Sequence, residues 1–226
     1  MRIGSILGRL LGGHAWVVSE QVEAQAQEPL DYPAQLTLDG VPLTLRLATA
    51  ADEQVLLTFA RALPEHDLLF LRRDITQPEH VRVWLQLVED GLYSTVIALR
   101  GDEVVGAATV GREGLSWSRH VAELRVLVAE SMRGKRLGRL LTEQAFANAR
   151  SMGVKKMVAQ MTTDQRAAIA VFSRMGFRRE ARLARHAIDR DGVLHDLQIM
   201  SLDVEEFRAR LDVLSLGPPD PLLGTY

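Results

Sequence analysis

A chain of 226 residues, 47% hydrophobic and 25% charged, is long enough and apolar enough for one well-cored domain with extensions. It contains no cysteine, which excludes disulfides, thiolate catalysis and cysteine zinc sites and favours a reducing, cytoplasmic setting. The formal net charge of −2 does not indicate nucleic-acid binding, and no apolar run reaches membrane-spanning length.

Both ends of the chain differ from its centre. Apolar residues at 3, 6, 7, 10 and 11 follow helical spacing, and residues 19–29 are polar. We interpret residues 3–11 as a helix that packs on its own domain; docking on a partner or a membrane surface is the alternative. The sequence therefore divides into an N-terminal helical extension and linker (1–33), a folded domain (34–203) and a C-terminal tail (204–226) that we expect to be mobile.

The folded part shows turn and cap signals that separate strands from helices. The predicted elements are, in chain order, a hairpin turning at 39–40, helices at 52–63 and 78–90, a hairpin turning at 101–102, a strand at 121–129, a helix at 137–153, a strand at 155–161, a helix at 164–175, and a hairpin of strands at 178–188 and 193–202. This order predicts an α/β (α+β) domain whose mixed central sheet, of about six or seven strands, is flanked by about four helices.

The passage from the strand at 121–129 into the next helix carries the first chemical signal. It reads Arg133-Gly134-Lys135-Arg136-Leu137-Gly138. A cationic turn that contains glycine and opens a helix presents backbone N–H groups, and the helix dipole, to an anion. The residues alone therefore indicate a phosphate site.

This segment resembles motif A of the GNAT superfamily of N-acetyltransferases, in which the loop binds the pyrophosphate of acetyl-CoA. Arg133 fits the first loop position and Gly138 the last, whereas Arg136 stands where the family has glycine. Arg136 still offers its backbone N–H and adds a positive charge for phosphate. Its side chain, however, takes up space if the backbone must approach the pyrophosphate closely. The resemblance implies that acetyl-CoA is the co-substrate and that the binding residues include Val126, Val128, Arg133, Gly134, Lys135, Arg136, Leu137, Gly138 and Arg139.

A second segment, residues 164–177, resembles motif B of the same family. Gln165 stands where the family has Asn, and Val171-Phe172 stands where it has Leu-Tyr. Gly176-Phe177 matches the Gly-Phe that ends the motif. Taken alone, this is also an ordinary apolar helix face with a glycine stop. The resemblance implies that Gln165 and Phe172 border acetyl-CoA, where neighbouring strands splay to admit the pantetheine arm. Phe172 has no hydroxyl to protonate the leaving thiolate, but a thiol with a pKa of about 8.5 can take its proton from water.

Glu123 is the candidate general base. An amine such as that of lysine is almost wholly protonated near neutral pH, so its acetylation benefits from a base. Ala122-Glu123-Leu124, followed by an apolar triplet, resembles the strand that carries the catalytic Glu of the bacterial Pat-type protein lysine acetyltransferases. The alternatives are a Glu on an exposed strand face, or one paired with Arg125 or Arg119.

Histidines offer further candidates. His120 adjoins the strand of Glu123 and could act through water, although such a residue is more often on the surface. His66 and His80 lie in the region expected to border the acceptor, and His186 and His195 are placed to pair across the last hairpin. The spacing matches no familiar metal motif, and no metal is expected.

These features predict an acetyl-CoA-dependent N-acetyltransferase in which the amine attacks the thioester directly and a backbone N–H near 126–128 stabilises the oxyanion. The Pat-like strand favours a protein lysine as acceptor; a small amine is the alternative, and residues 64–92 should supply the rest of the acceptor site. Two other classes remain: a non-catalytic acyl-CoA-binding regulator, and an amide-forming enzyme with a charged tRNA donor, against which the loop argues. No nucleic-acid partner is expected.

Overall fold

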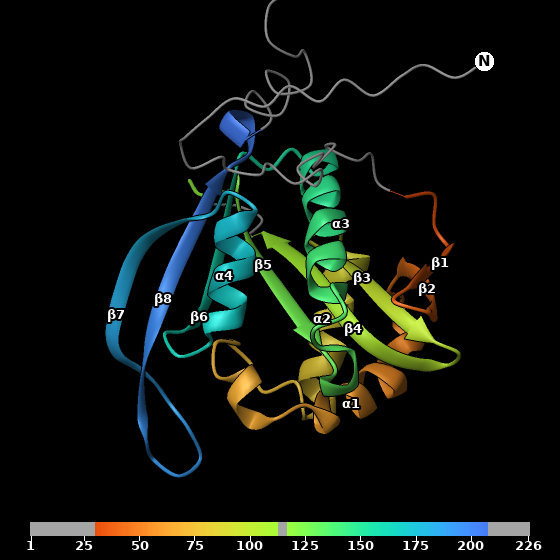
Figure 1. Ribbon diagram of the computed structural model, residues 1–226, viewed down its shortest axis with the longest axis horizontal. Helices are drawn as coiled ribbons and strands as arrows, with labels where there is room; N and C mark the ends of the chain where they lie inside the picture. Colours follow the sequence, from red (N-terminus) through yellow and green to blue (C-terminus); the bar gives the residue numbers. More distant parts are fainter. Residues whose placement is uncertain (1–29, 113–116, 208–226) are drawn as a thin grey trace, which may run out of the picture.

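The computed structural model describes residues 30–112 and 117–207 (Figure 1). The helix predicted at 3–11, the polar segment at 19–29 and the tail beyond 207 lie outside these residues. One sheet of eight strands runs through the described part in the order β1-β2-β3-β4-β5-β6-β8-β7. Its strands are β1 (Ala34–Leu38), β2 (Val41–Leu47), β3 (Tyr93–Arg100), β4 (Glu103–Arg112), β5 (Val121–Val128), β6 (Lys156–Thr162), β7 (Arg178–Ile188) and β8 (Leu194–Asp203).

Within the described residues, four α-helices longer than one turn accompany the sheet. They are α1 (Glu53–Ala62), α2 (Pro78–Glu89), α3 (Leu137–Ser151) and α4 (Arg166–Arg174), with short 3-10 turns η1 (Ala50–Asp52), η2 (Glu65–Leu68) and η3 (Glu130–Met132). The predicted order and the mixed sheet are confirmed, and the sheet has more strands than expected because both strands of the first hairpin join it. None of the described helices is long and apolar enough to cross a membrane.

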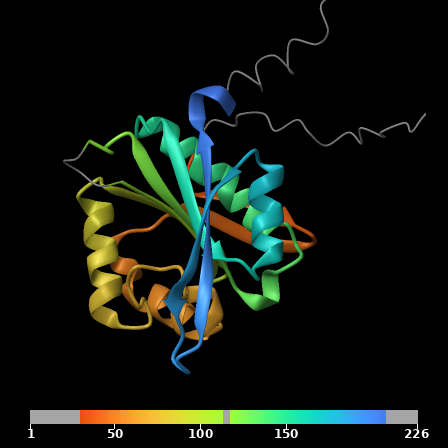
Figure 2. The same ribbon diagram turned by 90° about the vertical axis from the view of Figure 1, so that its left-hand side faces the viewer.

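The sheet is covered on both faces. In Figure 2, α2 lies on one side of the sheet and α3 and α4 lie on the other. Side chains alternate between the two faces, so Val96 packs in the core under α3 while its neighbour Ile97 packs in the core under α1 and α2. Because the middle of β3 and almost all of β4 are buried on both faces, these two strands form the rigid centre of the domain.

The pairing between β5 and β6 is the irregular part of the sheet. These parallel strands pair only from Val121 with Lys156 to Glu123 with Val158, and they then diverge (Figure 1). Beyond Glu123, β5 continues to pair with β4 on its other edge. The splaying implied by the resemblance is therefore present, and Glu123 is the last residue of β5 before it begins.

A partly buried ion pair ties the turn that precedes α1 to the sheet. Arg46 on β2 donates two hydrogen bonds to the carboxylate of Asp52, at 2.8 Å and 2.6 Å, and the backbone N–H of Thr49 donates a third at 2.8 Å. Only 4% of Asp52 is exposed. The hydrogen bond from Arg46 is the main cause that lowers the pKa of Asp52, with a smaller contribution from Thr49.

We predict that Asp52→Asn lowers the free energy of unfolding by about 1.5–3 kcal/mol at pH 7, because it removes charged hydrogen bonds in a buried place. Since the folded state lowers the pKa of Asp52, the stabilisation is complete above the ordinary value of about 3.9 and is lost as the pH falls through the folded-state value. Urea titrations at a series of pH values measure this difference.

Glu103→Gln is the matched control, because it breaks the exposed pair between Arg100 and Glu103. We expect this change to cost at most about 1 kcal/mol. Equal effects of the two substitutions at pH 7, or a difference for Asp52→Asn that does not shrink as the pH falls below about 3.9, would contradict the assignment.

Candidate active site

The cationic loop between β5 and α3 has the backbone of a glycine turn. Gly134 has a φ of +74°, and Arg136, which immediately precedes α3, has a φ of +63°. Arg136 therefore adopts the left-handed conformation that glycine favours, at a cost of about 1–2 kcal/mol. Arg136 thus differs from the family's glycine in residue type but has the backbone conformation that a glycine would have there. The guanidinium of Arg136 donates to Asp39 in the β1–β2 turn, at 2.6 Å.

The first turn of α3 offers backbone donors. No side chain of the described residues caps this helix, and its first backbone hydrogen bond runs from the N–H of Leu140 to the carbonyl of Arg136. The amides of Leu137, Gly138 and Arg139 precede that bond, as is general for the start of a helix. Leu137 is fully buried and thereby fixes the direction of the turn. This arrangement suits a pyrophosphate, since uncapped amides and a helix dipole meet a cationic loop.

One charged side chain of this loop, that of Arg133, contacts the connection between α1 and α2. Arg133 forms an ion pair with Asp67 in η2, in the connection between α1 and α2. Lys135 donates to the Ser131 carbonyl at 2.8 Å. Arg133 therefore joins the candidate phosphate loop to the segment on the acceptor side.

Glu123 points to the α2 face of β5 and is only 13% exposed at its side chain. Its Oε2 accepts from Arg125 at 2.7 Å and lies 3.4 Å from Nε of Arg72. Its Oε1 is buried and has no hydrogen-bond partner among residues 30–112 and 117–207. The ion pair with Arg125, considered above as an alternative to a catalytic role, is present, and no ion pair to Arg119 occurs among the described residues.

Arg125 is itself held on two sides. Its guanidinium carbon lies 5.7 Å from the centre of the Tyr93 ring. Burial acts to lower the pKa of Arg125, but the hydrogen bond and charge of Glu123 outweigh it, and the pKa is raised. The Tyr93 ring lies against Gly111, where an added Cβ would come within 2.6 Å of the ring. The strand β4 thus makes room for an aromatic ring beside the charged pair.

Val126 and Val128 lie on the opposite face of β5 and pack against the core under α3. Their backbones pair with Ala108 and Gly106 of β4. The side chains therefore serve the core, and the predicted contact with acetyl-CoA rests on the backbone at the edge of β5 that β6 has left.

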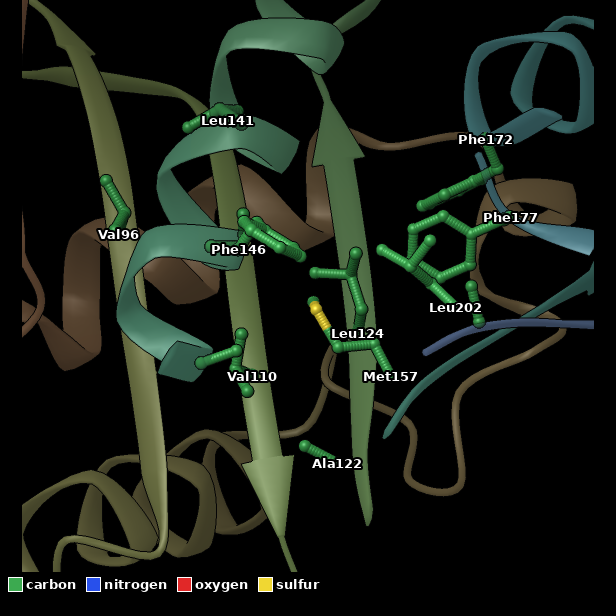
Figure 3. Close-up of a cluster of buried hydrophobic side chains, with 14 of the residues drawn as sticks. Val96, Val110, Ala122, Leu124, Leu141, Phe146, Met157, Phe172, Phe177 and Leu202 are labelled. Carbon is green, nitrogen blue, oxygen red and sulfur yellow. The ribbon is translucent and has the colours of Figure 1, made fainter. Parts of the chain in front are cut away.

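Gln165 and Phe172 have different surroundings. Gln165 immediately precedes α4, accepts from the Thr162 N–H at 3.3 Å and donates to the His66 carbonyl at 3.2 Å. Phe172 is buried, 5.1 Å from Phe177 in an edge-to-face contact (Figure 3). Gln165 thus ties the end of β6 to the α1–α2 connection, and Phe172 is primarily a core residue.

The structure brings together a group of titratable side chains that the sequence did not indicate. The side-chain donor atoms of His66, Asp164 and His195 lie within 4.8 Å of one another, and Asp189 holds His195 at 2.7 Å. Two imidazoles and a carboxylate are donor types that zinc accepts. No local spacing signals the group, because its members come from η2, the β6–α4 connection and β8.

The remaining histidines are separate from this group. Opposite His195 stands Ala187, so the predicted cross-strand pair with His186 is wrong by one position in register. His120 is exposed. His80 has Nδ1 2.8 Å from the Asp74 carbonyl, which only accepts, so Nδ1 carries the proton and Nε2 is the acceptor of the neutral ring.

A pocket of about 510 Å³ lies on the α2 face beside Glu123. The region 64–92, expected to border the acceptor, supplies much of its wall, and β4 and β5 contribute five further residues that the sequence did not indicate as acceptor residues. The described lining consists of Leu71, Arg72, Arg73, Ile75, His80, Trp84, Leu87, Leu92, Tyr93, Ala107, Thr109, Arg112, Arg125 and Leu127.

Similar structures share this architecture. The ribosomal-protein-alanine N-acetyltransferase of Brucella melitensis has a TM-score of 0.63 and 29% identity, covering 70% of this chain and 98% of that chain. A putative acetyltransferase of Salmonella typhimurium, solved with its cofactor acetyl-CoA, has a TM-score of 0.61 and 23% identity, covering 73% of this chain and 95% of that one.

Sequence comparison points the same way. A mycothiol acetyltransferase of Amycolatopsis mediterranei is 30% identical over 163 residues, which are 67% of this chain and 51% of that protein, so the chain spans about half the length of this relative. The model of the acetyltransferase (GNAT) family matches residues 59–177, more than half of the chain. The chain therefore belongs to the GNAT family of acetyltransferases.

Proposed function

We propose that this protein acetylates a primary amine, with Glu123 as the general base. The observation that carries the proposal concerns one oxygen of Glu123: Oε1 is buried at the point where β5 and β6 diverge and, in the part of the chain that the structure describes, has no hydrogen-bond partner. A buried carboxylate oxygen that lacks a partner costs free energy unless another group comes to it. An incoming ammonium, or a water that relays its proton, is such a group.

Each part of the site has a role in this reaction. When bound, acetyl-CoA supplies the acetyl thioester. The amides of Leu137, Gly138 and Arg139 hold its pyrophosphate, and a backbone N–H of β5 between 126 and 128 donates to the thioester carbonyl oxygen. Glu123 takes a proton from the amine as it attacks, and the departing thiolate takes one from water, because Phe172 has no hydroxyl.

The acceptor distinguishes two versions of this function. The resemblance of the strand of Glu123 to Pat-type enzymes supports a protein lysine, and the similarity to a ribosomal-protein-alanine N-acetyltransferase supports a protein acceptor more generally. The pocket of about 510 Å³ supports a small amine instead. The cytoplasmic location indicated by the lack of cysteine stays a prediction.

The non-catalytic alternative has a direct test. A regulator binds acetyl-CoA without turnover, so calorimetric binding of acetyl-CoA together with a release assay for CoA, over a panel of amines and peptides, separates the two. Binding with no turnover on any acceptor, including whole-cell lysate, would favour the regulator.

For the loop, we predict that Gly138→Asp weakens acetyl-CoA binding at least tenfold, or about 1.4 kcal/mol, because it sets a negative charge beside the pyrophosphate. A Cβ at this position would lie 3.6 Å from Val128, an ordinary contact, so the fold should tolerate a side chain. Gly138→Asn, which has the same size and no charge, is the control and should bind more tightly than the Asp variant. Wild-type affinity in a folded Gly138→Asp protein would exclude this loop from the phosphate site.

For the base, we predict that Glu123→Gln lowers turnover by about 10²- to 10⁴-fold, because the amide keeps the shape of the carboxylate and loses its basicity. Acetyl-CoA affinity should stay within about threefold of wild type, or about 0.7 kcal/mol. The residual rate should rise with pH, as more of the acceptor amine loses its proton without help. The measurement is a pH series of both proteins with one acceptor at saturation.

His80→Gln and His120→Gln are the matched controls for this experiment, since each removes another candidate base near the site. Turnover that survives in Glu123→Gln but falls in one of the histidine variants transfers the role to that residue. A parallel fall in turnover and acetyl-CoA binding in Glu123→Gln would make Glu123 a structural residue.

A further inference from the structure

Three side chains at one end of the β6–β8 ladder form a group that the acetyl transfer does not use. One donor atom each from His66, Asp164 and His195 lies within 4.8 Å of the other two. We propose that this group binds one divalent cation of the zinc class, and that the ion ties the α1–α2 connection to the β6–β8 end of the sheet. The inference goes beyond the proposed function and is independent of it, because neither Glu123 nor the phosphate loop supplies a ligand.

The sheet itself brings two of the three ligands together. The antiparallel pairing of β6 and β8 continues one residue past the end of β6, where the N–H of Thr163 donates to the Asp196 carbonyl at 3.0 Å. One further step in the same register leads to Asp164 on one strand and His195 on the other. The approach of these two side chains therefore follows from the ladder.

The third ligand, His66, comes from η2 and is held against the end of β6. Its carbonyl accepts a hydrogen bond from Gln165 at 3.2 Å. Its Nε2 lies 3.2 Å from Oγ1 of Thr162 and 3.2 Å from Oδ2 of Asp164. Because Thr162 is fully buried, it is a fixed partner for the ring. Both the backbone and the side chain of His66 are thus positioned at the group.

The distances suit a tetrahedral ion. Ligand atoms that lie about 2.0–2.1 Å from a zinc ion at tetrahedral angles are about 3.3 Å from one another. The pair of His66 Nε2 and Asp164 Oδ2, at 3.2 Å, already has this separation. The donor atom of His195 is at most 4.8 Å from either, so the group can close around an ion by a side-chain movement of about an ångström.

Hydrogen bonds keep these side chains in the form that a metal requires. Asp189 contacts Nε2 of His195 at 2.7 Å, and a carboxylate only accepts, so Nε2 carries the proton and Nδ1 keeps the lone pair of the neutral ring. Carboxylate partners of this kind orient metal-binding histidines. A hydrogen bond with Thr162 is the main cause that lowers the pKa of Asp164, and the charges of His66 and His195 contribute less. The Asp164 carboxylate is therefore ionised.

The donor types select the ion. Two imidazoles and one carboxylate are ligands of Zn²⁺ and of its neighbours Co²⁺ and Ni²⁺, whereas Mg²⁺ and Ca²⁺ prefer oxygen ligands throughout. Closed structural zinc sites have four protein ligands, and this group has three among the described residues. We therefore expect water at the fourth position and an ion that a chelator can remove.

The place of the ion gives it an effect on the chain. His66 belongs to η2, and the next residue, Asp67, pairs with Arg133 of the phosphate loop. Glu65, the residue before it, accepts from the N–H of Arg190 in the β7–β8 turn at 3.0 Å. An ion on His66 would reinforce these exposed contacts, and η2 could then leave the sheet only after the ion dissociates.

The test is metal binding by the full chain, prepared without an affinity tag and treated with a chelator. Calorimetry measures Zn²⁺, and the visible absorption of a tetrahedral complex reports Co²⁺. We expect one ion per chain, with Zn²⁺ bound at least about 100-fold more tightly than Mg²⁺. Hydrogen exchange in residues 64–68 should slow when Zn²⁺ is added.

Variants connect the binding to the group. His66→Gln and His195→Gln should each weaken Zn²⁺ binding by about tenfold or more, the loss that even a change in a ligand's hydrogen-bond partner produces. Asp164→Asn should do the same, and because its side chain is 61% exposed it should fold even where a histidine variant does not. His186→Gln is the matched control, since His186 is an exposed histidine of the same hairpin outside the group.

The outcomes decide both parts of the inference. Absence of Zn²⁺ binding, or binding that the three ligand variants leave unchanged, overturns the site, as does an equal loss in His186→Gln. Binding that needs the three ligands but leaves exchange in residues 64–68 unchanged overturns the role of the ion in tying the connection to the sheet. Slower exchange that Zn²⁺ produces in the wild type and in His186→Gln, but in none of the ligand variants, upholds both parts.

Discussion

The site depends on how briefly β5 and β6 pair. Parallel strands joined through a helix usually continue side by side, but here the ladder stops after Glu123 and Val158. From that point the two strands carry different parts of the site, the glycine turn and α3 after β5, and Gln165 and α4 after β6. Glu123 lies at the junction because it belongs to the last pair that the ladder contains.

Polar contacts connect the segments that follow β5 and β6 after the two strands diverge. The α1–α2 connection reaches both, since Asp67 pairs with Arg133 on one side and the carbonyl of His66 accepts from Gln165 on the other. These are polar contacts at a half-exposed place, and each is weak on its own. The rigid part of the molecule is the pair of doubly buried strands behind them, which sets the distance that the contacts span.

Local signals in the sequence carried most of the fold. One or two residues suffice to signal each of two elements: Asp39-Gly40 signals a tight turn, and Pro78 signals the start of α2. Both elements appear where predicted, and the turn residues have φ values of 48° and 79°. The candidate loop was visible for the same reason. Even so, the sequence could not show that Arg136 takes the conformation of the glycine it replaces, because residue type alone does not fix φ.

What the sequence could not show is which distant residues meet. Arg72, Arg112 and Arg125 come from a loop and two strands, and only the sheet brings them around one pocket. His66, Asp164 and His195 have no shared spacing at all. The pairing of Glu123 with Arg125 was foreseeable, since residues two apart share a face of a strand, but the buried free oxygen of Glu123 depends on everything that packs around it.

Gly111 has a consequence for how this pocket changes in evolution. It stands between Tyr93 on β3 and Glu123 on β5, opposite both, and its missing side chain is the space that the Tyr93 ring occupies. Any other residue there would turn the ring and, through it, shift the guanidinium of Arg125. Two relatives with the same lining residues would then hold differently shaped cavities, so comparing only the residues that touch a ligand would miss the cause of a change in substrate preference.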